Sequence, residues 1–454
     1  MMKNIGIETE SLALLDQALG QLVAGFSGLP AAEKGIPPLE EVQRVLNDVA
    51  LRMIDNFPYF HPLYAGQMLK PPHQVARLAY MLSLYINPNN HALDGGRASS
   101  AMEKEAVAEI AAMFGWDRFL GHLTGGGTMA NLEALWIAGQ IHPDRAVLAS
   151  TQAHYTHERL SGVLRLPFRA VPSDRYGRMD LAVLEATLDR EPVGTVVATI
   201  GTTATGAADP LPGLLKLRDR YGFRIHADTA YGGYFRLVDN LSPATREVFD
   251  HLGEVDSIVV DPHKHGLQPY GCGCVLFKDP AAGQYYKHDS PYTYFSSDEL
   301  HLGEISLECS RPGASAVALW ATQKLLPLAR GGAFASQLAS GRNAALQLFG
   351  LLEADDRFLT AFPPELDIVI WLPKAASASR ASELSRQLFE LAGKHNLHLA
   401  LAELPGRFFD LESAGMARDR DTITCLRSVL MKPEHESWVR QIWKILCHCV
   451  EELD

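Results

Sequence analysis

The stretch SIVVDPHKHG, residues 257–266, places a lysine directly after a short apolar run of strand length. Residues 257–260 are small or apolar, Asp261 and a proline end the run, and Lys264 stands between two histidines. Burial disfavours the charged form of a lysine and lowers its pKa, so the position is unfavourable unless the lysine has a use. The simpler alternative is a side chain that extends from the strand end to solvent.

Outward from this stretch, short apolar runs alternate with helical patterns between residues 120 and 280. The sequence predicts strands at 145–150, 194–200, 223–228, 256–260 and 272–278, and helices at 129–140, 157–164, 180–188, 211–220 and 242–251. Such alternation is typical of a mainly parallel sheet with helices on both faces. We therefore expect an α/β fold.

The flanking regions differ from this alternation. Helical spacing is present at 8–56, 74–85 and 100–114, and the turn-rich residues 87–100 read as a loop. A long helical region at 315–353 precedes a smaller unit with strands LDIVIW, LHLALAE and TITCLRSVL, a helix at 380–394 and a last helix from about 434. We expect a helical N-terminal segment at 1–75, a large domain at 76–330 and a small C-terminal α/β domain at 331–454.

Composition excludes several classes of protein. With 47% hydrophobic and 21% charged residues, the 454-residue chain is an ordinary globular protein. Its formal charge of −12 argues against a nucleic-acid or membrane-surface binder, and no apolar stretch approaches bilayer length. The N-terminal MMKNIGIETESLALL does not read as a secretory signal, and six sparse cysteines suit a reducing compartment. We expect a cytoplasmic protein.

Polar residues follow four of the predicted strands. His154 follows 145–150, Thr202 and Thr203 follow 194–200, Asp228 ends 223–228, and Lys264 follows 256–260. Ligands bind outside the carboxyl ends of strands in open α/β sheets, so these residues are expected on one rim. Taken singly, Asp228 could cap a helix, His154 could be a core histidine, and the threonines could end a strand.

A glycine-rich turn completes the set. The stretch HLTGGGTMANLEAL, residues 122–135, leads three glycines into a predicted helix. Backbone N–H groups and a helix N-terminus form an anion site suited to phosphate, although such a turn alone is weak evidence. The stretch is neither a Walker A loop nor GxGxxG, so it does not indicate a nucleotide site.

The combination indicates pyridoxal 5'-phosphate. The lysine can form a Schiff base with the cofactor aldehyde, a carboxylate can keep the pyridine nitrogen protonated, and a histidine can stack on the ring. Zinc is the alternative that Cys272, Cys274, His263 and His265 raise. The two cysteines are two apart on a strand and no second pair stands at ligand spacing, so no metal is expected.

The sequence resembles the group II pyridoxal-phosphate decarboxylases of the aspartate-aminotransferase-like fold, fold type I. The resemblance rests on TGGGTMANLEAL, STQAHYTHERL, ATIGTTATGAADP, IHADTAYGGYF, VDPHKHGLQPYGCG and SRPGASAVALW, in that order. It implies a large domain with a mainly parallel sheet of the seven-stranded type. The DPHKxG form, with His265 after the lysine, is most similar to the tyrosine/aspartate decarboxylase branch.

The resemblance also implies residue roles. Lys264 is the Schiff-base lysine, Asp228 pairs with the pyridine nitrogen, and Arg311 of SRPGAS binds the substrate α-carboxylate. The further cofactor contacts are Gly127, Thr128, His154, Thr202, Thr203, Ala230 and His263. Pocket walls are expected from 57–64 and 87–100, including Asn90 and His91 as substrate contacts.

The segment GQYYKHDSPYTYFSSDELHLG, residues 283–303, contains four tyrosines. In the family, a mobile loop at this place closes over the partner subunit's site, and one tyrosine donates a proton. Tyr292 and Tyr294 are the catalytic candidates, beside Tyr285 and Tyr286, with interface packing as the alternative for most of them. The resemblance therefore implies a homodimer with its active site at the interface.

The expected activity is that of a carboxy-lyase, which converts an L-amino acid, aromatic or acidic, to its amine and CO2. Other reactions on the same cofactor are the first alternative: carbon–carbon lysis, aldehyde synthesis or transamination. A cofactor-dependent structural or regulatory protein without turnover is the second. Neither nucleic acid nor membrane is expected as a partner.

Overall fold

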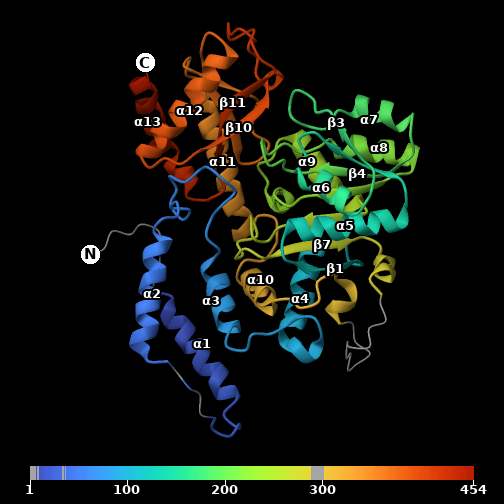
Figure 1. Cartoon of the computed structure of the whole chain (residues 1–454), viewed down its shortest axis with the longest axis vertical. Coiled ribbons are helices and arrows are strands. Elements are labelled where there is room, and N and C mark those ends of the chain that lie inside the picture. Colours follow the sequence, from blue (N-terminus) through green and yellow to red (C-terminus); the bar gives the residue numbers. More distant parts are fainter. Residues whose placement is uncertain (1–6, 8–9, 33–34, 36, 288–300, 454) are drawn as a thin grey trace.

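The computed structural model describes residues 7, 10–32, 35, 37–287 and 301–453. It contains two sheets, and the larger has seven strands in the order β1-β7-β6-β5-β4-β2-β3 (Figure 1). These strands are β1 (Leu120–Thr124), β2 (Ala146–Ser150), β3 (Phe168–Val171), β4 (Val193–Thr199), β5 (Arg224–Asp228), β6 (Ser257–Val260) and β7 (Gly273–Phe277). Strands β3, β2, β4, β5 and β6 are parallel, and β7 is antiparallel to both neighbours. The expected mainly parallel sheet is confirmed.

Helices flank this sheet as the alternating pattern predicts. They are α5 (Gly127–Ile141), α6 (Thr156–Val163), α7 (Leu181–Leu188), α8 (Leu211–Tyr221) and α9 (Pro243–Asp250). Strands β2, β4, β6 and β7 are buried at every position, which explains why they read as continuous apolar runs. The sequence analysis did not predict β1 and β3. These two strands are only partly buried and lie at the edges of the sheet.

The smaller sheet is wholly antiparallel, with strand order β10-β11-β9-β8. Its elements are β8 (Phe358–Thr360), β9 (Ile368–Pro373), α12 (Ala378–Lys394), β10 (Ala400–Pro405), β11 (Thr422–Val429) and α13 (His435–Leu453). A separate core cluster joins α11 (Ala333–Glu353), α12 and α13 to this sheet. The two sheets lie on either side of residue 330, and the exact domain boundaries stay a prediction.

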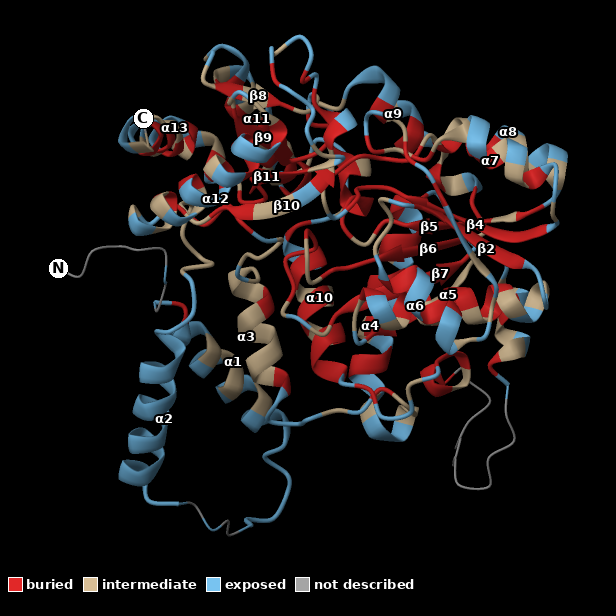
Figure 2. Ribbon diagram, turned by 45° about the horizontal axis from the view of Figure 1, so that its top comes forward, coloured by how far each residue is buried: buried red, intermediate tan, exposed pale blue. Residues whose placement is uncertain are grey.

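The N-terminal helices stand apart from both sheets. Helices α1 (Leu12–Gly25) and α2 (Leu39–Met53) bury no residue; α2 projects from the body of the chain (Figure 2), and α1 contacts α3. Helix α3 (Gln74–Ser83) and the kinked helix α4 (Leu93–Met113) pack against α10 (Gly313–Leu325). Within the described residues, no helix has the length and apolarity needed to cross a bilayer.

One prediction about local structure is wrong, and another gains detail. The predicted loop 87–100 is partly helical, because α4 begins at Leu93 and continues across a kink at Gly96. The predicted helical region 315–353 is confirmed and consists of two helices, since α10 ends at Leu325 and α11 begins at Ala333. Pro327, Gly331 and Gly332 lie in the break, where proline removes a donor and Gly331 adopts a positive φ of 70°.

Candidate functional site

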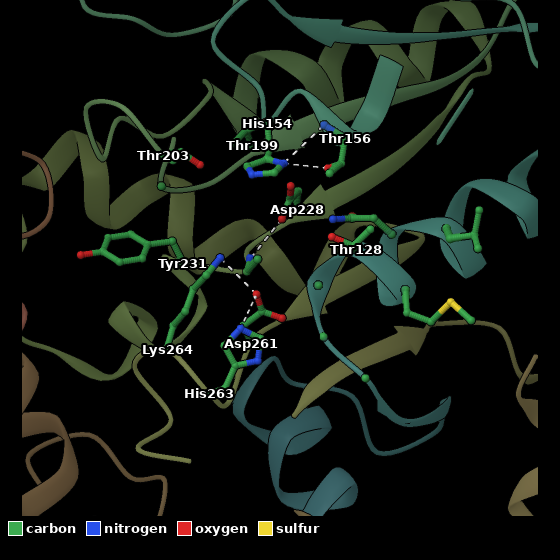
Figure 3. Close-up of a pocket in the computed structure, with 18 of the residues that line it drawn as sticks. Thr128, His154, Thr156, Thr199, Thr203, Asp228, Tyr231, Asp261, His263 and Lys264 are labelled. Carbon is green, nitrogen blue, oxygen red and sulfur yellow. Dashed lines mark hydrogen bonds and ion pairs between the residues drawn. The ribbon is translucent and has the colours of Figure 1, made fainter. Parts of the chain in front are cut away.

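A cavity of about 520 Å³ lies at the carboxyl ends of β4, β5 and β6, against the start of α5. Lys264 extends into it, and its Nζ lies 3.1 Å from Oδ2 of Asp261 (Figure 3). The lysine side chain is 20% exposed, so it neither reaches bulk solvent freely nor packs in the core. The position after β6 therefore presents an amine to a cavity, as the sequence predicted.

Asp228 lies at the end of β5 and lines the same cavity. Nε2 of His157 donates to Asp228 Oδ2 over 2.8 Å, and the Ala230 amide donates to Oδ1 over 3.1 Å. Burial raises the pKa of this carboxyl group, but the hydrogen bond and charge of His157, together with the charges of His226 and Lys264, outweigh burial and hold the pKa well below its ordinary value. Asp228 is therefore an ionised carboxylate in a nearly dry site, and its helix-cap alternative is not needed.

His154 and the threonines form another part of the lining. Nδ1 of His154 lies 2.8 Å from the hydroxyl of Thr156, and burial lowers the pKa of the His154 ring. Thr203 lines the cavity, whereas Thr202 is fully buried and pairs with the hydroxyl of Thr205 at 2.8 Å. Of the two predicted threonines, the structure brings only Thr203 to the cavity.

The glycine turn forms the floor of the cavity. Gly126 has a φ of +145°, and helix α5 begins at Gly127, where the first N–H groups of a helix have no partner within it. A Cβ on Gly127 would lie 2.7 Å from Asp261 Oδ2, so only glycine permits this close approach. Thr128 also lines the cavity, and His263 donates from Nδ1 to the Cys272 carbonyl over 2.8 Å.

These residues fit pyridoxal phosphate. The helix start offers N–H donors and a partial positive charge for a phosphate, and Asp228 offers a carboxylate for a protonated ring nitrogen. Lys264 offers the amine, and His154 offers an aromatic face in the same cavity. Because Nδ1 of His263 is already donating, its Nε2 can donate to a phosphate only when the ring is protonated.

The three predicted substrate contacts do not line this cavity. Arg311 is 4% exposed and forms an ion pair with the buried Glu103, while a second bond of 2.7 Å reaches the carbonyl of Leu123. Asn90 is fully buried and donates to Glu103 over 2.6 Å. His91 lies 4.0 Å from the Cys309 sulfur, outside the cavity lining. Within the described chain, Arg311 is an interior ion-pair residue, because the only carboxylate within its reach is Glu103.

The tyrosine candidates differ in whether the structure describes them. Tyr292 and Tyr294 lie outside the described residues. Tyr286 is 5% exposed and donates to Glu133 over 2.8 Å, so its hydroxyl is held in the core and away from the cavity. The Tyr286 hydroxyl is thus bonded to Glu133 and does not line the cavity.

Three residues that the sequence analysis did not select are prominent in the structure. His157 supports Asp228, and Asp261 binds Lys264. Arg427 of β11 is 4% exposed, and its Nε and Nη2 have no hydrogen-bond partner among the described residues. His157 stands three residues after His154, a helical spacing that offered a signal, whereas Arg427 lies in an apolar strand and offered none.

The chain is similar to several known proteins. The chain is 25% identical to the L-tyrosine decarboxylase of Enterococcus faecium, over 80% of this chain and 79% of that one. It is 30% identical to a probable L-tyrosine/L-aspartate decarboxylase of Methanothermobacter thermautotrophicus, over 57% of this chain and 70% of that one. The crystal structure of Catharanthus roseus tryptophan decarboxylase in complex with L-tryptophan superimposes with a TM-score of 0.76 at 18% identity, covering 99% of both chains.

A family model, the pyridoxal-dependent decarboxylase conserved domain, matches residues 32–371. This match covers the helical segment α2, the whole seven-stranded sheet and the start of the smaller sheet. Since it extends over well more than half of the chain, the protein belongs to the family of pyridoxal-dependent decarboxylases.

Proposed function

We propose that this decarboxylase removes CO2 from an L-amino acid with an aromatic or acidic side chain and releases the amine. The observation that carries the proposal is the Asp228 carboxylate, kept ionised by His157, in one cavity with Lys264. The substrate class is supported by relatives named as L-tyrosine and L-tyrosine/L-aspartate decarboxylases.

The chain's own residues have distinct tasks in this proposal. When bound, pyridoxal phosphate supplies an electron-withdrawing ring conjugated to the substrate α-carbon. Lys264 holds the cofactor through its Nζ, and Asp228 retains the proton on the pyridine nitrogen. His154 stacks on the ring, and the N–H groups at Gly127 and Thr128 bind the phosphate. Ala230 packs on the opposite side of the ring from His154.

Arg427 is the arginine that we assign to the substrate α-carboxylate in place of Arg311. Its guanidinium lies close enough to Tyr231 and Asp367 to interact electrostatically with both side chains, and Tyr231 lines the cavity. Among the described residues, its Nε and Nη2 lack hydrogen-bond partners while Nη1 donates to Gly66 and Gln67, whereas Arg311 is already paired with Glu103. A planar guanidinium with unused donors suits two-point recognition of a carboxylate.

We also propose that the enzyme is a cytoplasmic homodimer whose tyrosine loop acts on the partner subunit. Family resemblance and the tyrosine content of residues 283–303 support this assembly. Mixing inactive Lys264→Ala chains with chains inactivated by Tyr→Phe changes at 292 and 294 should restore activity, because one hybrid site keeps both groups. Formation of heterodimers without any restored activity would contradict a shared site.

The reaction is tested with a panel of L-amino acids and the cofactor-loaded enzyme. The proposal is supported if tyrosine, tryptophan, aspartate or glutamate gives labelled CO2 together with the matching amine. The Lys264→Ala variant should give neither product. Aldehyde with ammonia would indicate aldehyde synthesis, and a keto acid would indicate transamination. Turnover confined to aliphatic or basic amino acids would refute the substrate class while leaving the reaction intact.

A further inference from the structure

A second cavity of about 520 Å³ lies between the stretch that precedes α3 and the start of α13. Its wall includes two lysines, Lys70 and Lys432, and two histidines, His61 and His73. Leu267, three residues after Lys264, closes one side, and its carbonyl accepts from the His73 amide over 2.9 Å. This cavity shares no lining residue with the cofactor cavity.

The two lysines are unusual because neither has a carboxylate partner. Lys432 is 3% exposed, and its Nζ donates to the Tyr64 carbonyl over 2.6 Å while lying 5.2 Å from the centre of the Tyr64 ring. Nζ of Lys70 donates to the Met431 carbonyl over 3.3 Å. Across the described part of the chain, neither lysine forms an ion pair within 4.0 Å. An ammonium group has three N–H donors, so both retain donating capacity.

Burial of the two lysines without a contacting carboxylate lowers their pKa values. Burial, with the nearby Lys70 adding to it and Glu434 opposing it, lowers the pKa of Lys432 to about 7. Burial lowers the pKa of Lys70 to about 8, against the opposing influence of Asp367 and Glu434. Glu434 is exposed and is the acidic residue in the cavity lining. Among the described residues, the amines therefore lack the directly contacting counter-charge that buried cations usually have, because Asp367 and Glu434 act on them only from beyond ion-pair distance.

The histidines add donors without adding an opposing charge. Burial lowers the pKa of both His61 and His73, with Lys432 acting on His61 and Arg77 acting on His73. Nδ1 of His73 accepts from the Val75 amide over 3.2 Å, and Nδ1 of His61 accepts from the Leu63 amide over 3.1 Å. In both rings the proton must then reside on Nε2, which can donate.

We propose that this cavity binds a small oxyanion, a phosphate or carboxylate group, between the ammonium groups of Lys70 and Lys432. Charge-assisted hydrogen bonds from two amines are short and strong, and the anion supplies the missing counter-charge. The available volume exceeds that of a single phosphate or carboxylate group, so the occupant is a small molecule that carries such a group. The site is separate from the phosphate position of the cofactor, which lies at the start of α5.

Calorimetric titration of the cofactor-saturated enzyme tests the proposal. Because the cofactor occupies the glycine turn, any saturable binding of inorganic phosphate or succinate should take place in the second cavity. Sodium chloride at matched ionic strength is the control titrant. We expect one saturable site per chain for at least one of the two anions, and the tighter anion identifies the group. Cofactor absorbance should not change during the titration.

Variants connect the binding to the two lysines. Lys432→Met and Lys70→Met should each weaken binding by about tenfold or more, the size of one lost charge-assisted hydrogen bond. Lys432→Arg keeps the charge and should bind more tightly than Lys432→Met. Lys324→Met is the matched control, since Lys324 is an exposed lysine paired with Glu109, and should bind as the wild type does.

A measurement on the wild-type enzyme covers the case in which the variants do not fold. Phosphate or succinate should slow the reductive methylation of Lys432, as measured by peptide mass spectrometry. The methylation rate of Lys324 should not change. The proposal is overturned if neither anion gives saturable binding. It is also overturned if both methionine variants bind like the wild type, or if Lys432 is methylated at the same rate with and without the anions.

Discussion

Replacing His157 with leucine should sharply reduce catalysis although His157 need not touch the substrate. Its Nε2 donates to Asp228 Oδ2 over 2.8 Å, and both side chains are almost completely buried. A hydrogen bond to a charged group contributes roughly 1.5–3 kcal/mol. At about 1.4 kcal/mol for each factor of ten, His157→Leu should lower kcat/KM by roughly 10- to 100-fold.

The pH profile distinguishes this positioning role from a general loss of structure. His157 holds the pKa of Asp228 below its ordinary value, so the active carboxylate form persists to low pH in the wild type. Without His157, only His226 and Lys264 oppose the effect of burial, so the pKa of Asp228 should rise. The acidic limb of the kcat/KM profile should therefore move to higher pH in His157→Leu. His157→Gln keeps an N–H donor without a charge and should lie between the two.

The assay is steady-state kinetics from acid to neutral pH, with cofactor content measured by absorbance for each variant. His251→Leu is a suitable control, since His251 is a partly exposed histidine whose ring pairs with Glu254 far from the cavity. A kcat/KM of His157→Leu within about twofold of the wild type, with an unmoved acidic limb, would refute the reasoning. Asp228 would then be kept ionised without the help of His157.

Four further predictions concern the residues assigned to this site and the interior Arg311. Borohydride reduction of the holoenzyme followed by peptide mapping should place the pyridoxyl mass on Lys264, and its appearance on Lys278 would show that the wrong lysine was assigned. Asp228→Ala should retain cofactor but lose ~10²–10⁴-fold or more in kcat, as for a lost electrostatic or acid–base group, whereas a loss of only a few-fold would reduce Asp228 to a structural residue. Arg427→Lys should raise KM or lower kcat/KM by about tenfold with normal cofactor absorbance. Arg311→Met should instead lower the unfolding free energy by roughly 3–5 kcal/mol, because it leaves a buried carboxylate unpaired, and thermal unfolding that matches the wild type would contradict this assignment.

The sequence by itself determined the class of fold and the centre of the site. Alternating apolar runs and helical patterns are local properties, so β2, β4, β5, β6 and β7 appear close to their predicted positions. Parallel strands align their carboxyl ends, and for that reason Lys264, Asp228, His154 and Thr203 meet at one cavity. The motif order was sufficient to indicate the cofactor and the family, which the family model confirms.

The tertiary structure alone decided which polar side chains reach the cavity. Arg311 and Glu103 are 208 residues apart, and no local pattern indicates that they neutralise each other in the interior. His157 and Asp228 are 71 residues apart, and their bond depends on how α6 packs over the end of β5. Burial and charge pairing are properties of the packed chain, because each depends on atoms from distant segments. The strand ends were therefore predictable from the sequence, whereas the partners of their side chains were not.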